Sequence, residues 1–137
     1  MVDRDLILRR IADIEQYLQQ LADYRQIDLE SYQSDWKTQR IVERTLHLMI
    51  EGCMDLADHI VADRRLRVPD TGAAAFQTLA EAGVVSPDLG NALARMLGFR
   101  NILVHEYARL DPVIVLRVLQ TDVVDIERFR DAVLRAI

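Results

Sequence analysis

Cysteine, proline and glycine are scarce in this chain of 137 residues, which contains one cysteine, three prolines and five glycines. The single cysteine, Cys53, excludes an intrachain disulfide and is typical of a protein from a reducing cytosol. The shortage of glycine and proline argues against an architecture of short strands and tight turns. The composition therefore favours long helices.

The sequence also lacks segments that would target or anchor it. Residues 1–5, Met-Val-Asp-Arg-Asp, are unlike a signal peptide, and no apolar run approaches membrane-spanning length. Half of the residues are hydrophobic, which argues against disorder. We expect one all-α domain over residues 1–137, located in the cytoplasm and away from membranes.

Positive charge is in deficit, because the net charge is −5. A general nucleic-acid binder usually carries a basic surface, so broad and tight RNA binding is disfavoured. The basic residues are sixteen arginines and one lysine, Lys37. Because arginine contacts phosphate through a planar fork, the charge does not exclude a small local cleft that binds RNA.

Apolar periodicity and capping residues predict an up-and-down bundle of four to five helices. The expected elements are a helix from an Asp3 cap through Leu21, a polar connection with one helical turn from Gln26 to Ser34, a long helix from about Asp35 to Leu66, a short helix from about Ala73 to Ala82 stopped by Gly83, a helix from Ser86-Pro87 to about Tyr107, and a last helix from Asp111-Pro112 to the C-terminus, bent near Thr121-Asp122.

The last predicted helix is apolar around much of its circumference between Val113 and Leu134. A domain of this size cannot easily bury that surface together with the apolar stripes of the other helices. We therefore expect a homodimer face here, with tight packing inside one chain as the alternative.

Four chemically capable side chains lie close together near the end of the fifth predicted element. They are Arg100, Asn101, His105 and Tyr107. An arginine suits phosphate, and a histidine exchanges protons near neutral pH. The set suggests chemistry on a phosphodiester or on a nucleotide. The reaction would be RNA cleavage without a metal or cofactor, in which His105 would take the proton of the attacking 2′-hydroxyl, Arg100 would neutralise charge on the phosphoryl oxygens, and Asn101 would orient His105 or contact phosphate.

The spacing places a condition on this site. On an ideal helix, residues five apart are rotated by about 140°, so Arg100 and His105 are not neighbours, whereas Asn101 and His105 share a face, as do Arg100 and Tyr107. Either the helix loosens before His105, or a symmetric dimer combines the groups of two copies. By spacing alone, an arginine paired to a surface carboxylate and a histidine at a helix C-terminus is the simpler interpretation.

Metal and nucleophile sites elsewhere are not indicated. His47 and His59 lie twelve residues apart, and neither has a His or Cys four residues on, so we expect no metal site. Cys53 has no basic neighbour in sequence to lower its thiol pKa, which favours a place in the core.

One arginine cluster is a candidate for contact with RNA or with an acidic partner, and a second charged group is not. Arg64, Arg65 and Arg67 can contact RNA, although such a cluster is more often a solvated helix end. Arg40, Glu43 and Arg44 lie about one helical turn apart and are interpreted as ion pairs on a helix surface.

Residues 100–107 resemble the Arg-x4-His-x-Tyr signature of HEPN-domain toxins of the HepT type, with Arg100, His105 and Tyr107 at the matching positions. The resemblance extends over essentially the whole chain. The further matching segments are residues 40–44 and 51–60 of the long helix and residues 76–85 and 96–101 before the motif.

This resemblance implies an all-α homodimer that acts as a metal-independent ribonuclease, the toxin of a type II toxin–antitoxin system. Arg100 and His105 of both subunits would line the cleft, with Asn101 assisting. It also implies a cognate MNT-type nucleotidyltransferase antitoxin that transfers AMP from ATP to Tyr107. The alternative is a non-catalytic helical subunit that docks a nucleotidyltransferase, which the acidic net charge favours slightly.

Overall fold

The computed structural model describes residues 4–137, and over that range every regular element is helical. The elements are α1 (Arg4–Ala22), α2 (Leu29–Ser34), α3 (Trp36–Asp63), α4 (Gly72–Glu81), α5 (Pro87–His105), the 3-10 turn η1 (Tyr107–Arg109), α6 (Pro112–Arg117), the π-helical turn η2 (Val118–Asp122) and α7 (Val123–Ala136). The predicted cap at Asp3 lies outside the described residues.

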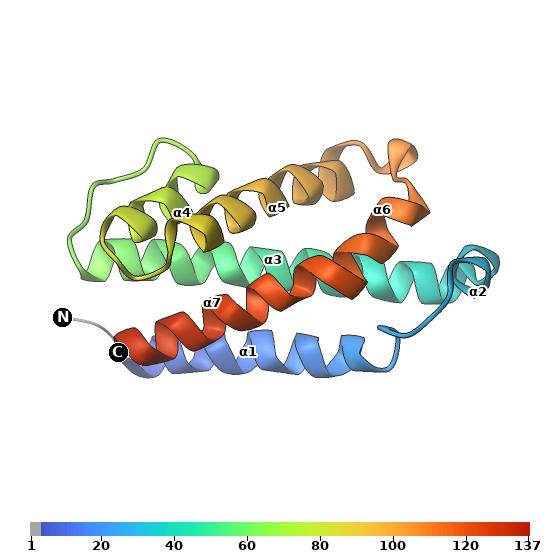
Figure 1. Cartoon of the computed structure of the whole chain (residues 1–137), viewed down its shortest axis with the longest axis horizontal. Coiled ribbons are helices and arrows are strands. Elements are labelled where there is room, and N and C mark those ends of the chain that lie inside the picture. Colours follow the sequence, from blue (N-terminus) through green and yellow to red (C-terminus); the bar gives the residue numbers. More distant parts are fainter. Residues whose placement is uncertain (1–3) are drawn as a thin grey trace.

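The long helix α3 is the spine of the bundle and contacts α1, α2, α4 and α5 (Figure 1). Asp35 begins it, because its carboxylate accepts hydrogen bonds from the backbone N–H groups of Lys37 and Thr38 at 3.1 and 3.2 Å. The helix ends at Asp63, three residues before the predicted end. Arg65 adopts φ 53°, and this left-handed conformation turns the chain out of the helix.

Helices α4 and α5 form an antiparallel pair on one side of α3, and both helix starts agree with the capping residues in the sequence. The hydroxyls of Thr71 and Ser86 accept hydrogen bonds from the backbone N–H groups of Ala74 and Leu89, each at 3.1 Å. Gly83, at φ 78°, makes the turn between the two helices as predicted.

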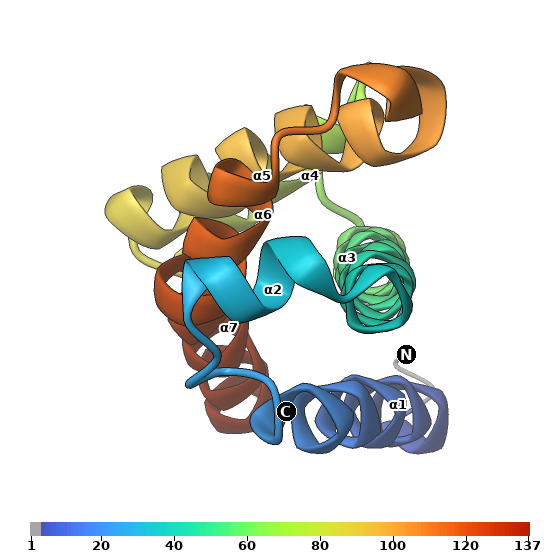
Figure 2. The ribbon, with the colours of Figure 1, turned by 90° about the vertical axis from the view of Figure 1, so that its right-hand side faces the viewer.

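The last helical segment runs antiparallel to α1, and it is not one regular helix. The π-helical turn over 118–122 interrupts it and confirms the predicted irregularity near Thr121. In the end-on view, α1, α3, the α4–α5 pair and α7 surround a common interior (Figure 2). Phe76 of α4 and Phe129 of α7 meet there edge to face, with ring centroids 5.6 Å apart.

Some of the apolar surface expected to face a second copy is indeed exposed. On α6 and α7 the exposed side chains are Val113, Ile114, Val124 and Leu134. The remaining apolar residues of this segment are buried in the bundle, which agrees with the expected packing inside one chain, while the homodimer face stays a prediction. Within residues 4–137, none of the helices combines the length and the apolarity that crossing a membrane would require.

Candidate active site

The four motif residues lie where α5 ends beside the first half of α3. Arg100, Asn101 and His105 belong to the last two turns of α5, and Tyr107 opens η1. The sequence predicted a helix through Tyr107, but the structure ends α5 at His105, because Glu106 leaves the helical conformation with φ −129° and ψ 41°. Tyr107 therefore does not share a helical face with Arg100, and its direction is set by the turn.

Arg100 is held against α3 by a carboxylate. Its Nε donates a hydrogen bond to Glu51 Oε1 at 2.6 Å, and its Nη2 forms an ion pair with the same oxygen. Its Nη1 donates to Asn101 Oδ1 at 3.1 Å. Two neighbours thus fix the plane of the guanidinium, which the sequence could not place.

The contacts of Glu51 continue along the surface of α3. His47 Nε2 lies 3.2 Å from Glu51 Oε1, and Arg44 Nη1 lies 3.1 Å from His47 Nδ1. Partial burial opposes ionisation of Glu51, but the hydrogen bonds and charges of Arg100 and His47 outweigh it and lower the pKa of that carboxyl. An ionised Glu51 is therefore the common anchor of a guanidinium and an imidazole.

His105 is not brought to Arg100 within the chain. It is exposed at the last position of α5, and the described part of the chain offers its ring no hydrogen bond or ion pair. Because α5 stays helical through His105, the helix does not loosen before this residue. Asn101 contacts Arg100, and no hydrogen bond joins it to His105.

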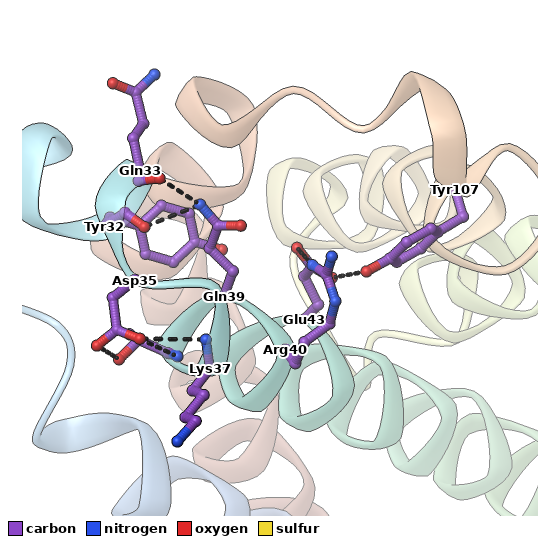
Figure 3. A network of polar contacts seen from close by, with 9 residues as sticks. Tyr32, Gln33, Asp35, Lys37, Gln39, Arg40, Glu43 and Tyr107 are labelled. Atoms are coloured by element: carbon purple, nitrogen blue, oxygen red, sulfur yellow. Dashed lines mark hydrogen bonds and ion pairs between the residues drawn. The ribbon is translucent and has the colours of Figure 1, made fainter.

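Tyr107 points from the turn after α5 toward α3 (Figure 3). Its hydroxyl donates a hydrogen bond to Glu43 Oε1 at 2.8 Å, and the guanidinium carbon of Arg40 lies 5.2 Å from the ring centroid. The ring is 45% exposed. Burial of the hydroxyl, its hydrogen bond to Glu43 and the charge of Glu43 raise the pKa of Tyr107.

A cavity of about 390 Å³ lies beside this tyrosine. It is lined by Arg40, Glu43, Arg44, His47, Leu103, Val104 and Tyr107. Polar and charged groups come from α3, and the apolar part of the wall comes from the end of α5. The cavity is large enough for part of a nucleotide and carries two guanidinium groups suited to phosphate.

The arginine cluster 64–67 lies far from this region. The distance from Arg44 to Arg64 along α3 is about 30 Å at 1.5 Å per residue. Arg64 donates to the Ala136 carbonyl at 2.7 Å, and Arg67 pairs with Glu81 at 3.2 Å. The structure does not bring this cluster together with the motif, and its contact with RNA stays a prediction.

Sequence reasoning missed the face of α3 that receives the motif. This face carries Arg40, Glu43, Arg44, His47 and Glu51, spaced by three or four residues. Ion pairing between Arg40 and Glu43 was predicted and is present at 3.3 Å, but their contact with Tyr107 was not. The sequence does show these residues as a charged stripe on an otherwise apolar helix, but it does not show that the end of α5 packs against the stripe.

The single cysteine lies where the sequence suggested. Cys53 is buried, and burial raises its pKa to about 12, which suits packing and not nucleophilic chemistry. Over residues 4–137, no three His, Cys, Asp or Glu side chains are grouped so that they could hold a metal ion.

Comparison with known proteins identifies the family. A family model described as ribonuclease HepT-like matches residues 14–133, which is most of the chain. This chain belongs to the HepT-like family.

Two HepT-like relatives are similar over most of their length. The mRNA nuclease HepT of Shewanella oneidensis is 31% identical over 131 residues, covering 94% of this chain and 96% of that protein. The tRNA nuclease HepT of Aphanizomenon flos-aquae is 35% identical over 107 residues, covering 78% and 73%.

The HepT-like fold is also found in a solved complex. A tri-AMPylated HEPN toxin of Shewanella oneidensis, solved with its MNT antitoxin, superposes with a TM-score of 0.87 at 30% identity, covering 98% of this chain and 99% of that one. The agreement confirms the predicted HEPN-like helical bundle.

Proposed function

We propose that this chain is the toxin of a type II toxin–antitoxin pair, a metal-independent endoribonuclease that acts in the cytoplasm as a homodimer. The observation that carries the proposal is the complete Arg-x4-His-x-Tyr motif, with Arg100 fixed by Glu51 and Asn101, in a chain similar throughout to HepT nucleases. Arg100, His105 and Asn101 are the proposed catalytic residues.

The reaction uses the ribose 2′-hydroxyl as nucleophile. His105 takes its proton, and a second proton donor protonates the leaving 5′-oxygen. A guanidinium has five N–H donors, and Arg100 directs three of them at Glu51 and Asn101. The two others are available for the phosphoryl oxygens, where charge grows in the transition state.

Pairing of two copies supplies the missing geometry. In one chain His105 faces away from Arg100, by about 140° on an ideal helix. A two-fold axis near the end of α5 would place the imidazole of one subunit opposite the guanidinium of the other. The exposed apolar residues of α6 and α7 support the presence of a second copy.

The proposed antitoxin is a cognate MNT-type nucleotidyltransferase that transfers AMP from ATP to Tyr107. Tyr107 is exposed enough to be reached, and it follows Arg100 by seven residues, just after the end of α5. Each added phosphate brings negative charge and bulk beside the arginines that would hold RNA. The added AMP groups therefore compete with RNA for these arginines, and the modified toxin binds its substrate poorly.

Induced expression tests the nuclease directly. The wild type should arrest growth and cleave RNA in the presence of a chelator, whereas Arg100→Ala and His105→Ala should each lower the cleavage rate by about 10²-fold or more. Arg9→Ala on α1 and His59→Ala on α3 are matched controls and should cleave like the wild type. Cleavage that survives both motif variants would contradict the proposal.

The neutralising step has its own measurement. After incubation with the partner and ATP, the peptide containing Tyr107 should gain one or more AMP masses, and Tyr107→Phe should gain none. A second function, a non-catalytic subunit that docks the nucleotidyltransferase, is favoured by the net charge of −5. It predicts AMP on Tyr107 together with harmless expression of the unmodified wild type.

A further inference from the structure

The hydroxyl of Tyr107 is already bonded to a base. Its oxygen donates to Glu43 Oε1 at 2.8 Å, a short hydrogen bond between a phenol and a carboxylate. Glu43 comes from α3, 64 residues earlier in the chain, so this contact depends on the tertiary fold. No feature of the ribonuclease reaction described above uses it.

Glu43 is held firmly in this position. Its side chain is only 11% exposed, and Arg40 Nη1 donates to both of its oxygens at 3.3 and 3.4 Å. The same guanidinium lies over the Tyr107 ring, so Arg40 aligns donor and acceptor together (Figure 3). Tyr32 of α2 is buried, and this burial together with the charge of Glu43 raises its pKa.

The cavity beside Tyr107 gives an incoming phosphate access to this pair. Arg40, Arg44 and His47 line it on α3, and Glu43 and Tyr107 both reach it. Among residues 4–137, these are the charged and titratable groups that line the cavity, and Tyr32 lies near enough for a charge effect on it from Tyr107. The only carboxylate among them is Glu43, and the two guanidinium groups suit the negative charge of a nucleotide.

We propose that Glu43 is the proton acceptor for nucleotidyl transfer to Tyr107, so that this chain supplies the base for its own modification. The Tyr107 oxygen attacks the α-phosphorus of ATP, and the bond from that phosphorus to the bridging oxygen breaks. Pyrophosphate leaves, the oxygen–phosphorus bond forms, and the phenolic proton passes to Glu43. This inference rests on the proposed function, because it assigns a residue to the same modification.

The need for a base follows from the environment of the tyrosine. A phenol with the ordinary pKa of about 10 is almost fully protonated at neutral pH, and the environment of Tyr107 raises its pKa further, so unassisted attack is slow. His47 lines the same cavity, but its two ring nitrogens are occupied by Arg44 and Glu51. Glu43 is the group placed to take the proton.

The test compares Glu43→Gln with Glu106→Gln. Glu106 precedes Tyr107 in the chain and pairs with Arg109 alone among residues 4–137, so the control makes the same change of charge without touching the hydroxyl. Initial rates of AMP transfer from ATP are measured with the purified nucleotidyltransferase between about pH 6 and pH 9. Thermal unfolding of each variant reports whether the fold is kept.

Glu43→Gln should lower the transfer rate by about 10²-fold at neutral pH, the usual contribution of a positioned base. Its rate should then rise with pH, because hydroxide in solution takes over, while the wild-type and Glu106→Gln rates stay nearly flat. Glu43→Asp, which restores a carboxylate, should recover a flat profile at a reduced rate.

Two results would overturn the inference: Glu43→Gln as fast as the wild type at every pH, or slowed by one constant factor across the range. The second would show that Glu43 only positions the ring. Failure of the proposed function looks different, because the wild type itself would then gain no AMP, or Tyr107→Phe would gain as much.

Discussion

Two carboxylates of α3 receive two residues of the motif. Glu51 holds Arg100, and Glu43, two turns earlier, holds Tyr107. Both contacts cross from α3 to the chain around the end of α5, and both are at least partly buried. His105 lies between Arg100 and Tyr107 in sequence, is exposed, and finds no such anchor among the residues that the structure describes. The residue left free is the one that the proposed reaction needs from the opposite subunit.

The anchor at Glu51 should contribute to stability in a pH-dependent way. Glu51→Gln should lower the free energy of unfolding by about 1 kcal/mol at neutral pH, a small value because the pair is partly exposed. The pKa of Glu51 is lowered in the folded protein, so its contribution is complete above the unfolded pKa and is lost as pH falls through the folded pKa.

Urea unfolding at about pH 7 and about pH 3 measures this difference. The gap between wild type and Glu51→Gln should be largest at neutral pH and should shrink in acid. Glu15→Gln on α1, at an exposed site, should stay close to the wild type at both values. A gap that widens in acid would contradict the assigned role of the ion pair.

At the scale of elements, α5 has to pack closely at its start to present the motif at its end. Gly90 lies against α4, where an added Cβ would come within 3.1 Å of Ala80 Cβ and 3.2 Å of the Phe76 carbonyl oxygen. Gly98, two turns later in the same helix, has open space around it. The two glycines therefore differ in purpose, although the sequence does not distinguish them.

Alanine at these two positions should change stability in opposite directions. Gly90→Ala forces α4 and α5 apart and should destabilise the fold by about 1 to 3 kcal/mol. Gly98→Ala should stabilise it by up to about 1 kcal/mol through higher helix propensity. Thermal unfolding measures the melting temperature of both variants against the wild type. Changes of the same sign in the two variants would contradict the packing assigned to the two glycines.

Most element boundaries could be predicted, because their causes are local. Asp35, Ser86 and Asp111 cap their helices through hydrogen bonds to backbone N–H groups only two or three residues away. The end of α5 could not, because the turn before Tyr107 brings its hydroxyl to Glu43, and periodicity carries no information about that contact. For the same reason the motif was visible in sequence and its anchors on α3 were not.

At the scale of the whole molecule, the single chain forms a helical bundle in which the proposed reaction site is incomplete. The bundle buries its core within one copy, with side chains such as Phe76 and Phe129 fully enclosed. Apolar residues remain exposed on α6 and α7, and Arg100 and His105 face different directions on α5. Both features are explained if two copies pair so that their α5 ends meet.

Mixing two inactive variants tests this pairing most directly. Arg100→Ala and His105→Ala are purified separately, confirmed to be folded and to cleave RNA only at their low residual rates, and then exchanged into mixed dimers. A mixed dimer keeps one guanidinium and one imidazole, each from a different subunit, so cleavage should reappear well above that of either parent. If the mixture stays as inactive as its parents while the exchange of subunits is complete, the two copies do not share a site and the account fails.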